Sequence, residues 1–376
     1  MNYGKRLSLE ALRGMAAIVV VVWHCLLDFK PDWAVFHGSP FYALIYGTSA
    51  VAVFFVLSGY VLSIGFFAKR ENQIILRGAV KRWPRLAGPV LVSCLITWAL
   101  YRLNLFYFMS ASEISGSAHL RSQLFFGMTP NDISFFDAAR VGLTTFFTGD
   151  RHYNNPIWTM HYEFLGSLIV FAMLFFISKK HLEERSTWLI IGLGFFIALA
   201  INPYLSLFPI GLSLVLILSK LGRSYFAAGF LLIISLYLLG YAGNPIGAYS
   251  WIRVGSRNAT SIQIIGAAGL VAAFELFPLT GRQLGSSIAS FLGRISFPLY
   301  LIHVPVLCSL GSFILIRSHS PLMAISVTLF SSIGLAFILS HFNEKWISCV
   351  DKFSSKVTGN ILQRQPSPKM AAPQET

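Results

Sequence analysis

Long uncharged apolar runs recur along the chain, and they limit its possible folds more than any other feature. The first begins with "LRGMAAIVVVVWHC" (residues 12–25), where every residue between Arg13 and His24 is apolar or small. The bilayer core holds no water to satisfy unpaired backbone groups, so spanning segments must be helices or closed barrels. The runs lack the alternation of barrel strands, which repeats over about ten residues. The sequence therefore predicts an all-α, polytopic membrane helix bundle.

Ten apolar windows predict about ten transmembrane helices. They cover residues 12–29, 42–67, 86–108, 156–178, 187–202, 204–219, 226–242, 262–279, 295–316 and 321–342. The fifth and sixth windows are joined only by "NPY", which leaves a tight hairpin and a re-entrant pair both open. Most of the 29 lysine and arginine residues fall on the side that carries the N-terminus. The positive-inside rule therefore places both termini in the cytoplasm.

Three stretches are not expected to span the membrane. Residues 69–85 mix apolar and basic residues and predict an amphipathic cytoplasmic stretch, and residues 109–155 predict the longest external loop. The chain from about Ser354 lacks apolar periodicity, which indicates disorder. We therefore expect one transmembrane domain over residues 1–350 and a cytoplasmic, disordered tail over residues 351–376.

The net charge of +14 does not indicate a nucleic-acid partner. The basic residues lie between hydrophobic runs rather than along one soluble face, as topology signals do. Only 12% of the residues are charged, about half the usual share for a soluble domain. The four cysteines are far apart and form no CxxC pattern, so we expect neither disulfides nor a metal site.

Arg13 and His24 lie eleven positions apart, which is about three helical turns. Both should therefore lie on nearly the same helix face, separated by about 16 Å along the axis. Arg13 is either an interfacial anchor or a binding residue. An ionisable group such as His24 is costly in a span and tends to face the bundle interior, which favours a functional role. Histidine is also well suited to accept a proton near neutral pH.

Three further stretches carry candidate residues. Arg82 and Arg85, three apart, share a helix face and suit either phosphate oxygens or anionic lipid. Ser58 precedes a glycine that permits close helix approach. Glu163 lies inside an apolar run and therefore needs a partner. His303, three residues after a tyrosine, is a candidate for chemistry or simply a hydrogen-bonded core histidine.

Taken in order over residues 7–345, these stretches resemble the acyltransferase 3 family of integral-membrane acyltransferases, which modify O-antigens, exopolysaccharides, nodulation factors and macrolides. The similar motifs are "SLEALRGMAAIVVVVWH", "VFFVLSGYVL", "RWPR", "PIWTMHYEF" and "GRISFPLYLIHVPV". They look like the family's basic-residue-to-His opening, second-helix, Arg-x-x-Arg, Trp-Ser-Leu-x-x-Glu and late Tyr-Leu-x-His motifs. Departures include Glu10 in place of Asp and the bulky His161 and Phe164, which imply a different acceptor preference.

The resemblance implies acetyl-CoA, or another short acyl-CoA, as the cytoplasmic donor, and a carbohydrate or glycoconjugate hydroxyl as the acceptor. It also implies a multi-pass protein of a bacterial inner membrane, and it leaves the oligomeric state and the acceptor's identity open. In the mechanism expected on this basis, Arg82 and Arg85 hold the CoA phosphates, and Arg13 binds pantetheine or phosphate at the entrance. His24 is the expected general base, with Glu163 orienting His24 or the acceptor. The residues expected to support the substrate or the structure are Glu10, Ser58, Trp158, Tyr300 and His303.

Two alternatives stay open at this point. One is a proton-coupled secondary transporter of a charged solute, with His24, Glu163 and His303 as a proton relay. The other is an acyl relay through Cys25, although adjacent helical residues diverge by about 100°, which would turn Cys25 away from the partners of His24.

Overall fold

The computed structural model describes residues 7–30, 36–179, 184–252, 259–277 and 286–363. Its regular structure within these ranges is helical, without strands, which confirms the all-α prediction. The helices are α1 (Leu7–Phe29), α2 (Gly47–Lys69), α3 (Asn72–Arg102), α4 (Phe108–Ser115), α5 (Ala118–Arg121), α6 (Phe135–Thr148), α7 (Trp158–Lys179), α8 (Glu184–Ile201), α9 (Leu207–Ser219), α10 (Tyr225–Leu239), α11 (Ala259–Leu276), α12 (Ser286–Val306), α13 (Ser312–Ser318) and α14 (Pro321–Gln363).

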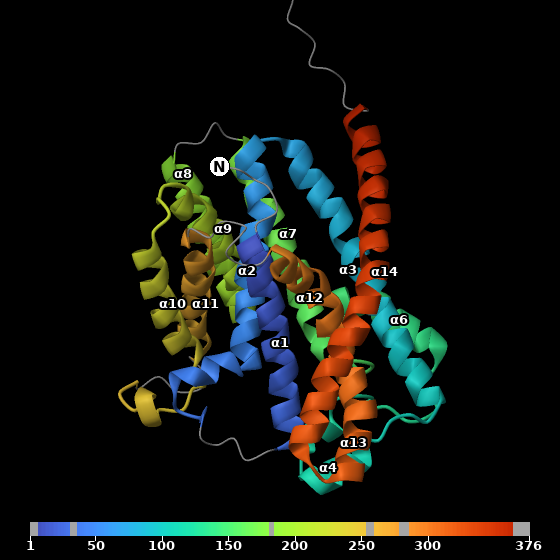
Figure 1. Ribbon diagram of the computed structural model, residues 1–376. Coiled ribbons are helices and arrows are strands. Elements are labelled where there is room, and N and C mark those ends of the chain that lie inside the picture. Colours follow the sequence, from blue (N-terminus) through green and yellow to red (C-terminus); the bar gives the residue numbers. More distant parts are fainter. Residues whose placement is uncertain (1–6, 31–35, 180–183, 253–258, 278–285, 364–376) are drawn as a thin grey trace, which may run out of the picture.

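Eight helices of the described chain are long and apolar enough to cross a membrane, and two shorter apolar helices, over Pro203–Ser219 and Tyr225–Leu239, accompany them. Together they account for the ten predicted windows and show a multi-pass membrane protein. A short turn of 3-10 helix, Pro203–Ser206, joins α8 to α9, and the two helices pack together as a hairpin. In Figure 1 the start of α1 and the end of α14 lie toward the same end of the bundle.

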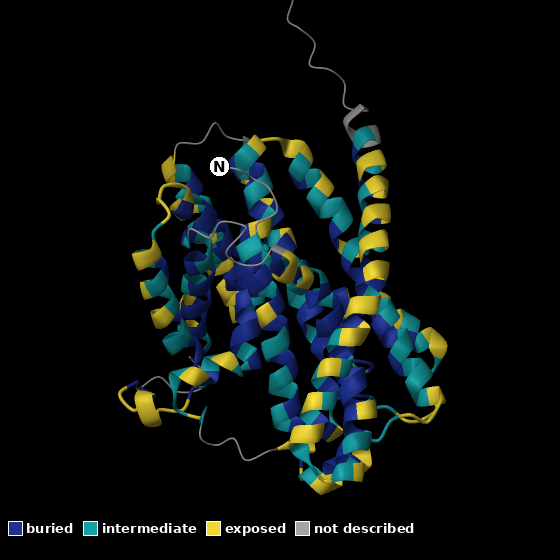
Figure 2. Cartoon of the chain, in the orientation of Figure 1, coloured by how far each residue is buried: buried dark blue, intermediate teal, exposed yellow. Residues whose placement is uncertain are grey.

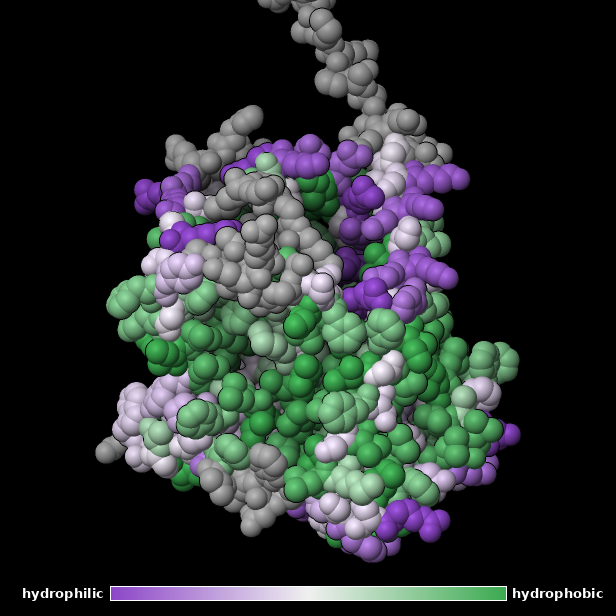
Figure 3. Space-filling model, viewed as in Figure 1, coloured by the Kyte–Doolittle hydropathy of each residue, from purple (hydrophilic) through white to green (hydrophobic). Residues whose placement is uncertain are grey.

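The surface carries an apolar band with hydrophilic side chains at both ends (Figure 3). Buried residues concentrate in the middle of the bundle, as Figure 2 shows. Large apolar side chains are exposed on the outer helices, including Phe196 on α8 and Phe226 and Ile233 on α10. An exposed apolar surface of this extent suits contact with lipid rather than with water.

Helices α2 and α9 cross in backbone contact because each carries a glycine at the crossing. A Cβ atom on Gly59 would collide with the carbonyl oxygen of Phe208, and one on Gly211 would collide with that of Val56. The close helix approach predicted from Ser58 and its following glycine is confirmed.

Helix α3 is longer at its start than predicted. Residues 72–85 join the expected span in one helix that ends at Arg102, so the predicted end at residue 108 is wrong. The helix continues through two prolines, Pro84 and Pro89, and the indole nitrogen of Trp346 on α14 donates to the Pro84 carbonyl oxygen at 2.8 Å. Packing against α14 therefore supports the stretch where prolines interrupt the backbone hydrogen bonds.

Helix α14 continues past Ser354 to Gln363, so disorder is not observed where it was predicted to begin. The reason is packing against α3: Ser354 and Thr358 are fully buried, and Lys81 forms an ion pair with Asp351 at 3.3 Å. Residues 364–376 of the predicted tail lie outside the described residues.

Candidate active site

A cavity of about 350 Å³ lies toward the end of the bundle where α1 begins and α14 ends. Helices α1, α2, α3, α7, α12 and α14 form its wall. The polar and charged lining residues are Glu10, Arg13, Ser58, Arg82, Arg85, Thr159, Glu163, Arg294, Ser296, Tyr300, Asn343 and Glu344. The three arginines expected to bind the donor therefore line one cavity.

Glu163 contacts Arg82 rather than His24, contrary to expectation. It forms an ion pair with the Arg82 guanidinium, and Ser58 donates a hydrogen bond to the same carboxylate oxygen at 2.5 Å. The side chains of Arg82 and Glu163 are only 9% and 13% exposed. A buried carboxylate needs such a partner, so Glu163 holds Arg82 against the cavity wall.

The other arginines differ in how they are paired. Arg13 donates to Glu10 at 2.7 Å, and Gly293 of α12 leaves room for that carboxylate, because a Cβ there would collide with it. Arg294 donates to Ser340 at 3.1 Å. Within the described chain, Arg85 makes no hydrogen bond or ion pair, which leaves its guanidinium available to an anionic ligand.

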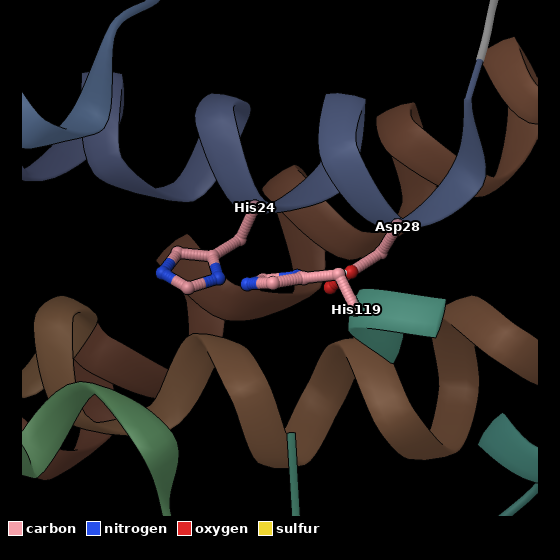
Figure 4. A group of neighbouring side chains, drawn as sticks. All are labelled: His24, Asp28 and His119. Atoms are coloured by element: carbon pink, nitrogen blue, oxygen red, sulfur yellow. The ribbon is translucent and has the colours of Figure 1, made fainter. Parts of the chain in front are cut away.

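A second polar group lies at the far end of α1 (Figure 4). His24 and Asp28 project from α1 toward His119 of α5. The Asp28 carboxylate, which is fully buried, lies 2.6 Å from Nδ1 of His119. The rings of His24 and His119 have centroids 5.7 Å apart. We call His24, Asp28, His119 and Gln123 the outer cluster.

Gln123 joins the members of the outer cluster. Its amide nitrogen lies 3.0 Å from Nδ1 of His24, 2.7 Å from Asp28 and 3.2 Å from Nδ1 of His119. Ligand atoms of those three residues lie within 4.8 Å of one another, a spacing that could suit a metal ion. An amide NH₂ is a donor and cannot ligate a cation, so an ion would first have to displace Gln123.

Two aromatic side chains connect the cavity to the outer cluster. Tyr300 lines the cavity, and its hydroxyl lies 2.8 Å from that of Thr159. The Tyr300 ring lies 6.0 Å from that of His303, which in turn lies 5.0 Å from that of His24. His24 itself does not line the cavity. His303 is fully buried, and its Nε2 has no partner among the described residues.

Other expected residues take structural positions. The Trp158 ring packs against Tyr162 and Tyr204, with centroids 5.7 and 5.4 Å apart. Cys25 is fully buried in an apolar cluster beside α12. The proton relay expected for a transporter is not assembled, because Glu163 is paired with Arg82 away from the two histidines.

Helix α5 lies outside the spanning helices, and it carries a histidine with a perturbed pKa. Burial lowers the pKa of His119, but the hydrogen bond and the charge of Asp28 outweigh burial and raise it above the ordinary value of 6.5. Its side chain is 37% exposed. His119 is thus the member of the outer cluster with both access to the surface and a carboxylate behind it.

Asp28, His119 and Gln123 were missed in the sequence. The spacing of four residues between His24 and Asp28 places both on one helix face and was the available signal. Nothing local to the loop indicates that it folds back on the end of α1, where Ser117 donates to the Leu27 carbonyl oxygen at 3.0 Å.

Comparison with known proteins agrees with the motifs. The family model described as an acyltransferase domain matches residues 6–341. An O-acetyltransferase of Phomopsis amygdali, PaAT-1, is 26% identical over 367 residues, covering 81% of this chain and 72% of the relative. No solved structure matches.

Proposed function

Because this chain belongs to the acyltransferase 3 family and is a membrane acyltransferase, we propose that it moves an acetyl group from acetyl-CoA to a hydroxyl of a cell-surface or exported carbohydrate. The observation that carries the proposal is the cavity in which Arg13, Arg82 and Arg85 converge. The relative's activity supports an acetyl group and an oxygen acceptor. A bacterial inner membrane, with exopolysaccharide or lipopolysaccharide as the modified polymer, is part of the proposal.

The donor's phosphates bind first to Arg85. Its guanidinium is unpaired within the described chain, and guanidinium groups match phosphate oxygens with two parallel hydrogen bonds. Arg13 and Arg82 add positive charge, although Glu10 and Glu163 already hold their positions. The larger part of CoA stays outside the cavity, at the cytoplasmic face of the proposed topology.

The acyl arm then extends from the cavity past Tyr300 and His303 toward His24. Arg13 and His24 are separated by about 16 Å along α1, since each residue adds about 1.5 Å to a helix. This separation is about the length of an extended pantetheine arm. The thioester would meet the acceptor at the outer cluster, so the cofactor would not need to cross the membrane.

The acceptor reaches the outer cluster from the opposite side. His119 is 37% exposed there, and the cluster holds the side chains needed to take a proton from a hydroxyl. Holding the thioester and the hydroxyl in contact supplies much of the rate by proximity.

Donor binding tests the proposal directly. We expect Arg85→Ala, in lipid nanodiscs, to raise the Kd for acetyl-CoA at least about tenfold, which corresponds to 1.4 kcal/mol. The matched control is Arg317→Ala, because Arg317 lies on α13 over the Phe313 ring, away from the cavity. Equal affinities of wild type and Arg85→Ala, or no binding by wild type, would contradict the assignment of the donor site.

A further inference from the structure

The amide of Gln123 determines which ring nitrogen carries the proton in each histidine of the outer cluster. An amide nitrogen has two protons, yet three acceptors surround it, namely Nδ1 of His24, Asp28 and Nδ1 of His119. One of the three therefore cannot receive a hydrogen bond from Gln123.

The orientation of the amide is set at both ends. Asn155 donates to the Gln123 oxygen at 3.2 Å, so the nitrogen faces the outer cluster. The Asp28 carboxylate can only accept, and it receives one proton from Gln123. Its other oxygen lies 2.6 Å from Nδ1 of His119, so that nitrogen must be the donor. The second Gln123 proton is left for Nδ1 of His24.

The two histidines consequently adopt opposite tautomers. His119 carries its proton on Nδ1, facing Asp28, and has a free lone pair on Nε2. His24 accepts at Nδ1 and, when neutral, carries its proton on Nε2. A carboxylate behind Nδ1 with a free Nε2 is the arrangement of a general base held by an acid, as in the serine hydrolase triad.

We propose that His119, positioned by Asp28, takes the proton from the acceptor hydroxyl, and that His24 donates its Nε2 proton to the thioester carbonyl oxygen. The inference rests on the acyl transfer proposed above and assigns roles within it. His24 and His119 are catalytic residues in this scheme, whereas Asp28 and Gln123 are positioning residues.

The step balances as follows. The acceptor oxygen attacks the acyl carbon while its proton passes to Nε2 of His119, and a tetrahedral intermediate forms with its oxyanion against Nε2–H of His24. The intermediate collapses, the C–S bond breaks, and the thiolate of CoA takes the proton from the His119 imidazolium. The products are the acyl ester and CoA, and His119 is neutral again.

The surroundings of His119 fit this role. Asp28 and His24 face it from α1, and Arg151 faces it from the segment before α7. Asp28 is its only carboxylate partner within the described chain, and Lys30 is directed to the Gly116 carbonyl oxygen at 2.6 Å. Removing the Asp28 charge should therefore lower the pKa of His119.

The test is the pH dependence of kcat/KM for acetyl transfer by the full-length protein in nanodiscs. His119→Asn keeps an amide donor near the position of Nδ1 but removes the basic Nε2. We expect a loss of 10²–10⁴-fold and the disappearance of the acidic limb of the profile. Asp28→Asn should move that limb to lower pH.

His24→Gln keeps an amide donor near the position of Nε2. We expect it to lose activity, to keep the acidic limb, and to be at least about tenfold more active than His24→Ala, which has no donor. His319→Asn is the matched control, because His319 is exposed at a φ of 52° that asparagine tolerates. It should leave both the rate and the profile unchanged.

Three results would overturn the assignment. The acidic limb could persist in His119→Asn while vanishing in His24→Gln, which would make His24 the base. His119→Asn could keep wild-type activity. EDTA could abolish wild-type activity with recovery on adding zinc, which would make the cluster a metal site. Acetyl-CoA binding is measured for every variant: intact binding shows that a variant is folded, whereas absence of binding or transfer in wild type contradicts the proposed function instead.

Discussion

Single side chains divide the arginines of the cavity into paired and unpaired ones. Arg82 is nearly buried and is held by Glu163, whereas Arg85 lacks an ion-pair partner in the described chain. A family motif of two arginines three apart therefore contains two different functions. One arginine builds the wall, and the other is free to receive an anion.

The ion pair between Arg82 and Glu163 should contribute to stability. Glu163→Gln leaves a buried guanidinium without its counter-charge, so we expect it to lower the free energy of unfolding by roughly 1–3 kcal/mol. Arg82→Gln and the double variant complete a cycle, measured by unfolding in mixed SDS and detergent micelles. Additive losses within about 0.5 kcal/mol would show that the pair is not coupled.

His119 should make stability depend on pH. Because Asp28 raises the pKa of His119 in the folded state, its charged form stabilises the protein below the unfolded pKa of about 6.5. That contribution is lost as the pH rises through the folded pKa. Between pH 6 and 8, the thermal midpoint of wild type should therefore fall more than that of His119→Asn. Parallel curves for the two proteins would contradict the interaction.

At the scale of helices, glycines determine how closely the spans that carry the site approach. Gly59→Val on α2 would force the helix away from α9, which we expect to cost about 1–3 kcal/mol by overpacking. Gly192→Val on α8 is the control, because a Cβ there meets nothing within 4 Å. Thermal unfolding in detergent compares the two, and an equal effect would mean that the crossing is not close in the native state.

Apolar windows located the helices well but misplaced the ends of α3 and α14. Hydropathy records where lipid begins, and it carries no information on which helices continue into water. Lys81 and Asp351 stabilise such an extension by pairing α3 with α14 across 270 residues of sequence. Contacts of that kind depend on helix neighbours that a single sequence does not specify.

The same limit applied to the site. Motif order predicted that Arg13, Arg82 and Arg85 belong together, and one cavity does hold them. The partner of Glu163 was wrongly expected to be His24, because the side of α7 that faces α3 is not readable from hydropathy. His119 and Gln123 were missed because they come from a loop whose position depends on long-range contacts with α1.

At the scale of the whole molecule, the even number of crossings puts Ser355 and the start of α1 on one side and the outer cluster on the other. In a Cys349→Ser background, a membrane-impermeant maleimide should label Asn131→Cys on intact cells. It should label Ser355→Cys only after permeabilisation. Cys25, Cys94 and Cys308 are buried and should stay unreactive. The reverse pattern of labelling would invert the topology and exclude a cytoplasmic donor.

One measurement compares the two ends of the proposed route, Arg13 in the cavity and His24 in the outer cluster. Purified Arg13→Ala, His24→Ala and wild type are each given labelled acetyl-CoA with a glycan acceptor, and both donor affinity and ester formation are recorded. We predict weaker donor binding in Arg13→Ala, and in His24→Ala intact binding without transfer. Full transfer by both variants, or loss of donor binding in His24→Ala alone, would contradict a single route through the bundle.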